Sequence, residues 1–90
     1  MLGFRKFRVK EASMEPTLSP GDVILTERLT YLFRRPRLGE IVVARNDGII
    51  QVKRVVDERG RKYLLLGDNT SYSSSFLVRR REILGKCLGL

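Results

Sequence analysis

The chain has 90 residues, which is enough for one small domain covering residues 1–90 and too few for a second hydrophobic core. Its 42% of hydrophobic residues excludes a disordered chain, and its net charge of +8 favours anionic partners such as nucleic acid, acidic lipid or acidic protein. With no histidine and one cysteine, Cys87, we expect no metal site, no cofactor and no internal disulfide.

The first third of the chain predicts two strands joined by a loop. Residues 4–10 alternate apolar and basic side chains, which is typical of a half-exposed edge strand. Prolines and a glycine between residues 16 and 22 indicate a loop and turn, and β-branched residues predict a second strand over residues 22–27. Residues 29–38 fit no single element, because Pro36 ends any helix that begins there.

The middle of the chain predicts a hairpin and a further strand. Strands over residues 39–45 and 49–57 flank the turn sequence Asn46-Asp47-Gly48. A second turn over residues 58–61 leads to a strand over residues 62–66.

The last part predicts a polar loop over residues 67–75 and a final strand over residues 82–88. No segment reaches the length of a usual helix, so the fold class is all-β, as a small barrel or coiled sheet. No stretch approaches the roughly 20 apolar residues that span a bilayer, and the start has no signal-peptide apolar region. We therefore expect a cytoplasmic protein.

Ser13, at the end of the first predicted strand, is a candidate nucleophile. Pro16 fixes its own φ and pushes Glu15 into an extended conformation, so the backbone near Ser13 is stiff. A nucleophile benefits from such stiffness, since small displacements of a reacting group are costly in rate. Taken alone, the segment also fits a serine in an ordinary turn.

Lys53 is a candidate general base, because the chain has no imidazole to take a proton from serine. Strand alternation places Gln51, Lys53 and Val55 on one face of its strand, and Val52 and Arg54 on the other. A lysine with an ordinary pKa near 10.4 is protonated at neutral pH, so this role requires burial among apolar neighbours. The segment by itself also fits a lysine on the solvent face of a hairpin.

Gly67-Asp68-Asn69 opens the polar loop, and the serines that follow it are Ser71, Ser73, Ser74 and Ser75. A hydroxyl from this loop could orient the lysine amine, as the third member of a triad does. Asp68 and Asn69 are typical of a tight turn that their own side chains hold.

Taken together, these segments resemble type I signal peptidases, because their blocks follow one another in the same order from Val9 onward. The blocks are Ser13-Met14-x-Pro16-Thr17-Leu18, Gly21-Asp22, Gly39-Glu40-Ile41-Val42-Val43, Val52-Lys53-Arg54-Val55, Leu66-Gly67-Asp68-Asn69 and Ile83-Leu84-Gly85-Lys86.

The resemblance implies a serine endopeptidase with a Ser-Lys dyad, in which Ser13 is the nucleophile and Lys53 the general base. Ser73 falls where the family places a serine that supports the lysine, and Met14, Asp68 and Asn69 belong to the matching blocks as supporting residues. The implied substrate is an extended segment of a protein precursor, with small residues at the first and third positions before the cut.

The chain resembles the short, soluble branch of nickel-type superoxide dismutase maturation proteases, because it is short, has no membrane anchor and has Gly67-Asp68-Asn69 close behind the strand of Lys53 without large insertions. That resemblance implies removal of an N-terminal leader or propeptide from a precursor, with a nickel superoxide dismutase as the candidate substrate.

Two positions depart from the family pattern. Glu11 stands where many members carry a small or hydroxyl residue that helps to form the oxyanion hole, and a carboxylate cannot donate to an oxyanion. After Gly67-Asp68-Asn69 the family usually has Ser-x-Asp-Ser-Arg, whereas this chain has Ser73-Ser74-Ser75-Phe76-Leu77. The aspartate and arginine that brace the family's site are therefore absent.

Two alternatives stay open. One is a catalytically impaired basic β-barrel that binds a membrane surface or nucleic acid, with peripheral membrane contact through aromatic and leucine side chains near arginines: Phe4, Phe7, Tyr31, Leu32 and Phe33. The other is the self-cleaving domain of SOS-type repressors, which is disfavoured because no DNA-binding segment precedes Ser13.

Overall fold

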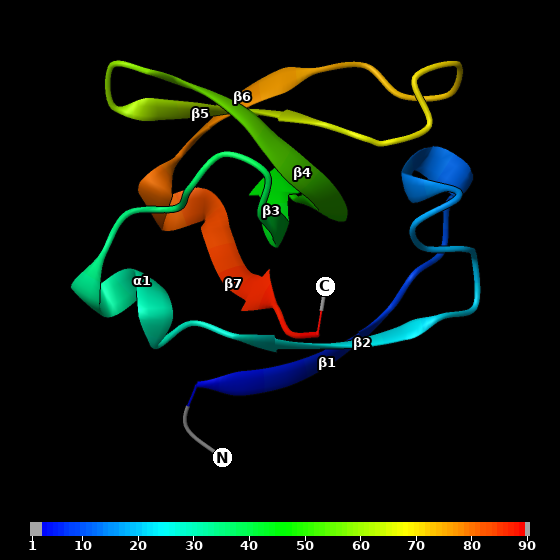
Figure 1. Cartoon of the computed structure of the whole chain (residues 1–90), viewed down its shortest axis with the longest axis horizontal. Helices are drawn as coiled ribbons and strands as arrows, with labels where there is room; N and C mark the ends of the chain where they lie inside the picture. Colours follow the sequence, from blue (N-terminus) through cyan, green and yellow to red (C-terminus); the bar gives the residue numbers. More distant parts are fainter. Residues whose placement is uncertain (1–2, 90) are drawn as a thin grey trace.

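The computed structural model describes residues 3–89 as one curled antiparallel sheet of seven strands (Figure 1). The spatial order of the strands is β1-β2-β7-β3-β4-β5-β6. The strands are β1 (Phe4–Arg8), β2 (Val23–Glu27), β3 (Ile41–Asn46), β4 (Ile49–Arg59), β5 (Lys62–Leu66), β6 (Phe76–Arg79) and β7 (Ile83–Cys87). Three single turns of helix complete the fold: η1 (Ala12–Met14), α1 (Thr30–Phe33) and η2 (Arg80–Glu82).

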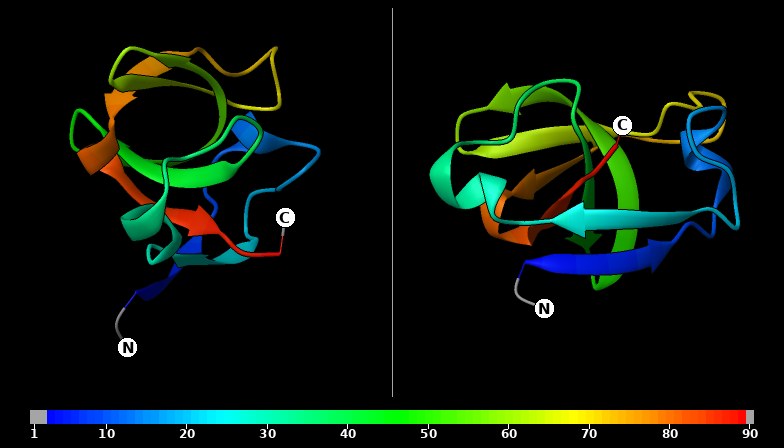
Figure 2. Two further views of the ribbon diagram at one scale, coloured as in Figure 1. Left: turned by 60° about the vertical axis from the view of Figure 1, so that its left-hand side comes forward. Right: turned by 60° about the horizontal axis from the view of Figure 1, so that its bottom comes forward.

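The sheet bends around a hydrophobic interior and has the shape of a half-barrel (Figure 2). The pairing of β4 with β5 shifts register between Val55 and Asp57, and the pairing of β3 with β7 shifts between Val43 and Ala44. Such bulges bend the strand that carries them. The prediction of an all-β barrel or coiled sheet is confirmed.

β3 is covered on both faces, which explains its unbroken apolar sequence. Ile41, Val42, Val43 and Ala44 are all buried, and alternate residues point to opposite sides of a strand. One cluster of buried side chains contains Tyr31, Val42, Ala44, Val55, Tyr63, Leu65, Val78 and Ile83. The other contains Val9, Met14, Leu18, Ile24, Ile41, Val43 and Cys87.

The hairpin between β3 and β4 forms where the turn sequence predicts it. Asp47 and Gly48 both have positive φ, of 51° and 78°, and this backbone is typical of the tight turns that Asp-Gly favours. The hairpin register places Lys53 opposite Val42 at the centre of the sheet. The turn therefore fixes the position of the candidate base.

Most predicted strands are present with bounds shifted by one or two residues at their ends. β6 was not predicted, because it is only four residues long and follows directly on the serine-rich loop. In residues 29–38 the chain forms the single turn α1 and ends it before Pro36. Within residues 3–89, no helix is long and apolar enough to cross a lipid bilayer.

Candidate active site

Ser13 lies in the middle of η1, directly after the edge strand β1 and its extension. Met14 anchors this turn, since its side chain is 1% exposed and packs in the second apolar cluster. Glu15 leaves the turn with extended backbone (φ −65°, ψ 144°), as expected before Pro16, and the Glu15–Pro16 peptide bond is cis. The serine is thus held on a short, anchored turn and is itself buried.

Lys53 reaches Ser13 from β4. Its side chain is 4% exposed, and Nζ donates a hydrogen bond of 2.6 Å to Ser13 Oγ. The lysine therefore lies inside the protein and not on the solvent face of the hairpin. The structure brings together two residues that are 40 positions apart in the sequence.

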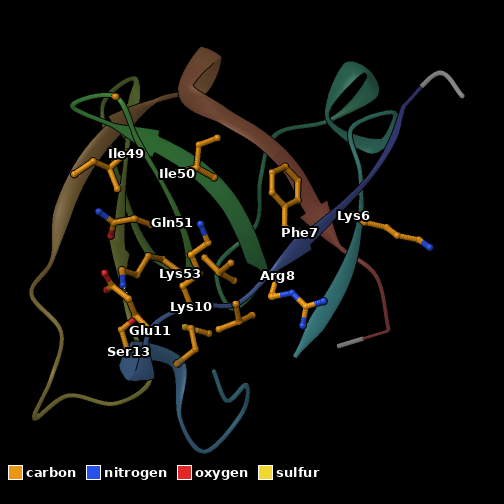
Figure 3. A pocket seen from close by; sticks show the side chains of 14 residues that line it. Lys6, Phe7, Arg8, Lys10, Glu11, Ser13, Ile49, Ile50, Gln51 and Lys53 are labelled. Carbon is orange, nitrogen blue, oxygen red and sulfur yellow. Dashed lines mark hydrogen bonds between the residues drawn. The ribbon is translucent and has the colours of Figure 1, made fainter. Parts of the chain in front are cut away.

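Burial lowers the pKa of Lys53 below its ordinary value, because desolvation disfavours the charged ammonium. The negative charge of Glu11 acts in the opposite direction and raises the pKa. Glu11 is exposed, and its side chain points into the same pocket as Lys53 (Figure 3). A lysine with a lowered pKa can accept a proton from a serine hydroxyl closer to neutral pH.

The loop after β5 holds η1 in place. The backbone N–H of Asn69 donates to the carbonyl oxygen of Ser13 at 2.9 Å, and Asn69 Nδ2 donates to the carbonyl oxygen of Ala12 at 3.0 Å. Gly67 packs directly under this turn, where a Cβ atom would lie 2.3 Å from the Ser13 carbonyl oxygen. Only glycine leaves room for this approach.

Asp68 ties the same loop to β4. Arg54 donates to Asp68 through Nε at 2.8 Å and through Nη2 at 2.7 Å, and Thr17 Oγ1 also donates to this carboxylate. Both interactions lower the pKa of Asp68, with Arg54 as the larger cause. The prediction that the side chains of Asp68 and Asn69 hold a local turn is therefore wrong: they bind segments distant in the sequence. The bidentate pair of Arg54 and Asp68 therefore holds this loop in place, although the serine-rich loop lacks the aspartate and arginine that brace the site in the family.

Ser73 has a different partner from the one that the resemblance implies. Its Oγ accepts a hydrogen bond of 2.9 Å from the backbone N–H of Gly67. In the part of the chain that the structure describes, Ser73 makes no hydrogen bond to Lys53, so its contact with the dyad runs through Gly67 and the Ser13 turn.

The sequence of the chain matches the model of a known protein family. The family model described as peptidase S24-like matches residues 6–88, which include η1, β4 and the Gly67–Asn69 loop. The chain belongs to the peptidase S24-like family.

The chain is also similar to signal peptidase I of Aquifex aeolicus (strain VF5), with 37% identity over 57 residues. This match covers 60% of the chain and 22% of the relative, so the chain spans less than a quarter of that protein's length. The resemblance to signal peptidases is confirmed. Neither comparison bears on the nickel superoxide dismutase branch.

In this peptidase S24-like protein, the Ser13–Lys53 pair lies at one end of a pocket of about 550 Å³. The pocket runs between β1 with the stretch that follows it and the first half of β4, and Ile49 and Ile50 lie at its far end (Figure 3). The pocket could not be predicted from sequence, since it forms between segments about 40 residues apart. Arg54 was also missed as a site residue, although it stands next to Lys53 in the matching block and is the cation on the opposite face of the strand.

Proposed function

We propose that this protein is a serine endopeptidase in which Ser13 is the nucleophile and Lys53 the general base. The observation that carries the proposal is the buried 2.6 Å contact between Lys53 Nζ and Ser13 Oγ in a chain without histidine. The family match supports peptide bond hydrolysis as the type of reaction.

In the proposed reaction, neutral Lys53 takes the proton of Ser13 as Oγ attacks the scissile carbonyl carbon. The resulting ammonium gives this proton to the leaving amine, the peptide bond breaks, and an acyl ester forms on Oγ. Lys53, neutral again, then takes a proton from water as its oxygen attacks the ester. Return of that proton to Oγ releases the acid and restores both residues.

The backbone N–H of Ser13 is the proposed oxyanion donor. Glu11 lines the pocket beside the dyad, and its carboxylate accepts hydrogen bonds but does not donate them. One missing donor typically costs about 2.7–4 kcal/mol of transition-state stabilisation, so we expect a slower enzyme than a relative with a hydroxyl residue at this position.

The proposed substrate is the N-terminal leader or propeptide of a protein precursor, bound in an extended conformation. β1 is an edge strand of the sheet and pairs with β2 alone. Together with the chain that follows it, β1 forms one wall of the pocket. Edge segments of this kind bind peptides by main-chain hydrogen bonds. A nickel superoxide dismutase precursor is a candidate substrate, because Gly67-Asp68-Asn69 follows closely behind the strand of Lys53 with no large insertion between them, as the resemblance to that branch implies.

The test is incubation of the protein with a mixture of unstructured peptides and with precursor proteins, followed by mass spectrometry of the new termini. We expect cuts that share small residues at the first and third positions before the bond. Ser13→Ala is the matched control, because it removes one buried oxygen and leaves the packing of Met14 intact. If cuts persist in Ser13→Ala at the same sites, Ser13 is not the nucleophile.

The charge of Glu11 gives a separate prediction about pH. Glu11 raises the pKa of Lys53, so Glu11→Gln should lower it and populate the neutral amine at lower pH. The rising limb of kcat/KM against pH is therefore expected to move to lower pH, with a smaller shift at high salt. Glu15→Gln is the matched control, since Glu15 does not line the pocket. An unmoved limb in Glu11→Gln would contradict the electrostatic link.

A further inference from the structure

The side of the molecule opposite η1 carries exposed apolar residues among many cations. α1, η2 and the turn between β4 and β5 lie together at one end of the sheet, and η1 lies at the other (Figures 1 and 2). Segments 30–40, 57–62 and 79–82 contain nine Lys and Arg residues against four Asp and Glu residues, a net charge of +5 out of +8 for the chain. We call this surface the arginine face.

Contacts between the three segments hold the arginine face together. Arg80 Nη2 donates to the carbonyl oxygen of Tyr31 at 3.0 Å, and its guanidinium stacks over the Tyr31 ring. Arg35 forms a salt bridge with Glu58 at 3.2 Å, which joins the segment after α1 to the end of β4. Because these contacts join segments that are distant in the sequence, the fold fixes the positions of these segments relative to one another.

Six cations of the arginine face surround a single depression of about 600 Å³, which no acidic residue lines: Arg59, Arg61, Lys62, Arg79, Arg80 and Arg81. Within residues 3–89, no carboxylate lies within salt-bridge distance of Arg61, Lys62 or Arg81. Uncompensated positive charge of this density is typical of a site that binds anionic groups.

The arginine face also exposes large apolar side chains, in α1 and in the segment that follows it. Phe33 is 87% exposed, Leu32 66% and Leu38 61%, although each is large enough to favour burial. Tyr31, which the sequence placed in the same exposed group, is instead buried, and its hydroxyl donates to Glu40 at 2.8 Å. The exposed apolar set on this face therefore consists of leucine and phenylalanine side chains that have no hydrogen-bonding group.

We propose that the arginine face binds an anionic lipid membrane surface, with Phe33 and Leu32 in the interfacial region and the arginines at the headgroup phosphates. Leucine side chains cannot read base edges or phosphates, whereas apolar insertion next to cations is how peripheral proteins bind anionic bilayers. η1, which carries Ser13, lies at the other end of the molecule and stays open to substrate in this orientation. The inference does not depend on the proposed peptidase activity.

The test is sedimentation with vesicles of phosphatidylcholine alone and of phosphatidylcholine mixed with phosphatidylglycerol. The protein is expected to bind only the mixed vesicles, and less at high salt. Removal of one cation near an anionic surface lowers the partition coefficient about fivefold. The partition coefficient of the double variant Arg61→Glu/Arg81→Glu onto the mixed vesicles should therefore fall by at least about 25-fold. Arg5→Glu/Arg45→Glu is the matched control: it changes net charge equally at exposed arginines outside the arginine face, and we expect a much smaller loss.

Leu32→Ser/Phe33→Ser tests the apolar part and should weaken vesicle binding several-fold while leaving net charge unchanged. Equal losses in the two charge-reversal variants, or full vesicle affinity in the serine variant, would overturn the proposal. Binding of a fluorescent oligonucleotide is measured in the same variants. If the oligonucleotide binds more tightly than the vesicles, loses affinity in Arg61→Glu/Arg81→Glu and keeps it in Leu32→Ser/Phe33→Ser, the face binds nucleic acid instead. Cleavage of a short peptide, measured in the same variants, reports on the dyad separately and should not change.

Discussion

Lys53→Met is expected to abolish peptide hydrolysis and, at neutral pH, to stabilise the fold. Loss of the base should reduce kcat/KM by at least about 1000-fold, as loss of a dyad or triad member does in other serine hydrolases. Methionine has a similar length and no charge to desolvate, so it should pack where the lysine is buried. We expect a gain on the order of 1 kcal/mol, a melting temperature higher by about 4–8 °C.

The pH dependence of this gain follows from the direction of the pKa shift. The folded state has a lowered Lys53 pKa, so between that value and the ordinary range near 10.5 the unfolded chain binds more protons. The stability contribution of Lys53 therefore rises with pH across this window and is at its lowest below it. The difference in unfolding free energy between Lys53→Met and the wild type should shrink as pH rises.

Urea unfolding at several pH values measures this difference. Lys62→Met is the matched control, because Lys62 is exposed on β5 and its replacement removes the same charge from solvent. A stability gain of equal size in both variants would mean that general charge reduction, and not burial of Lys53, is the cause.

Gly67→Ala is expected to disable the site through its backbone. A Cβ at this position would lie 2.3 Å from the Ser13 carbonyl oxygen and 2.6 Å from Ser73 Oγ, so η1 must shift. Overpacking of this kind costs about 1–3 kcal/mol, and a displacement of about 1 Å at the nucleophile can cost a hundredfold in rate. Stability and kcat should therefore fall together.

Gly60→Ala separates this effect from the general cost of replacing a glycine. Gly60 has a positive φ of 64° but open space around its Cα, so alanine there adds backbone strain without a contact near Ser13. We expect reduced stability with unchanged kcat in Gly60→Ala. Unchanged kcat in Gly67→Ala as well would show that Gly67 does not position the serine.

The strands could be predicted from sequence because their apolar and turn residues are local signals. The Asp47-Gly48 turn and the unbroken apolar run of β3 specify the hairpin that carries Lys53. The burial of Lys53 could not be predicted, since alternation places one cation on each face of β4. Which face is covered depends on η1 and on the loop that begins at Gly67, both distant in the sequence.

The candidate dyad was found through the order of blocks along the chain, whereas its support depends on contacts that no local pattern reveals. Arg54 and Asp68 are 14 positions apart on different elements, and Asn69 binds a carbonyl 57 positions away. Asp and Asn after a glycine usually indicate a local turn, and here the tertiary structure uses the same side chains to join segments. Tyr31 was misplaced for a related reason, because its partner Glu40 lies beyond Pro36.

The titration of Lys53 tests the proposed mechanism most directly. In a protein with ¹³C-labelled lysine, the ε-carbon resonance of Lys53 is assigned as the one missing in Lys53→Met and followed by NMR over a range of pH. The mechanism predicts a pKa well below the ordinary value, and a lower one still in Glu11→Gln. A midpoint near 10.4, shared with the exposed lysines, would mean that Lys53 is protonated at neutral pH, and it would contradict the assignment of this residue as the base.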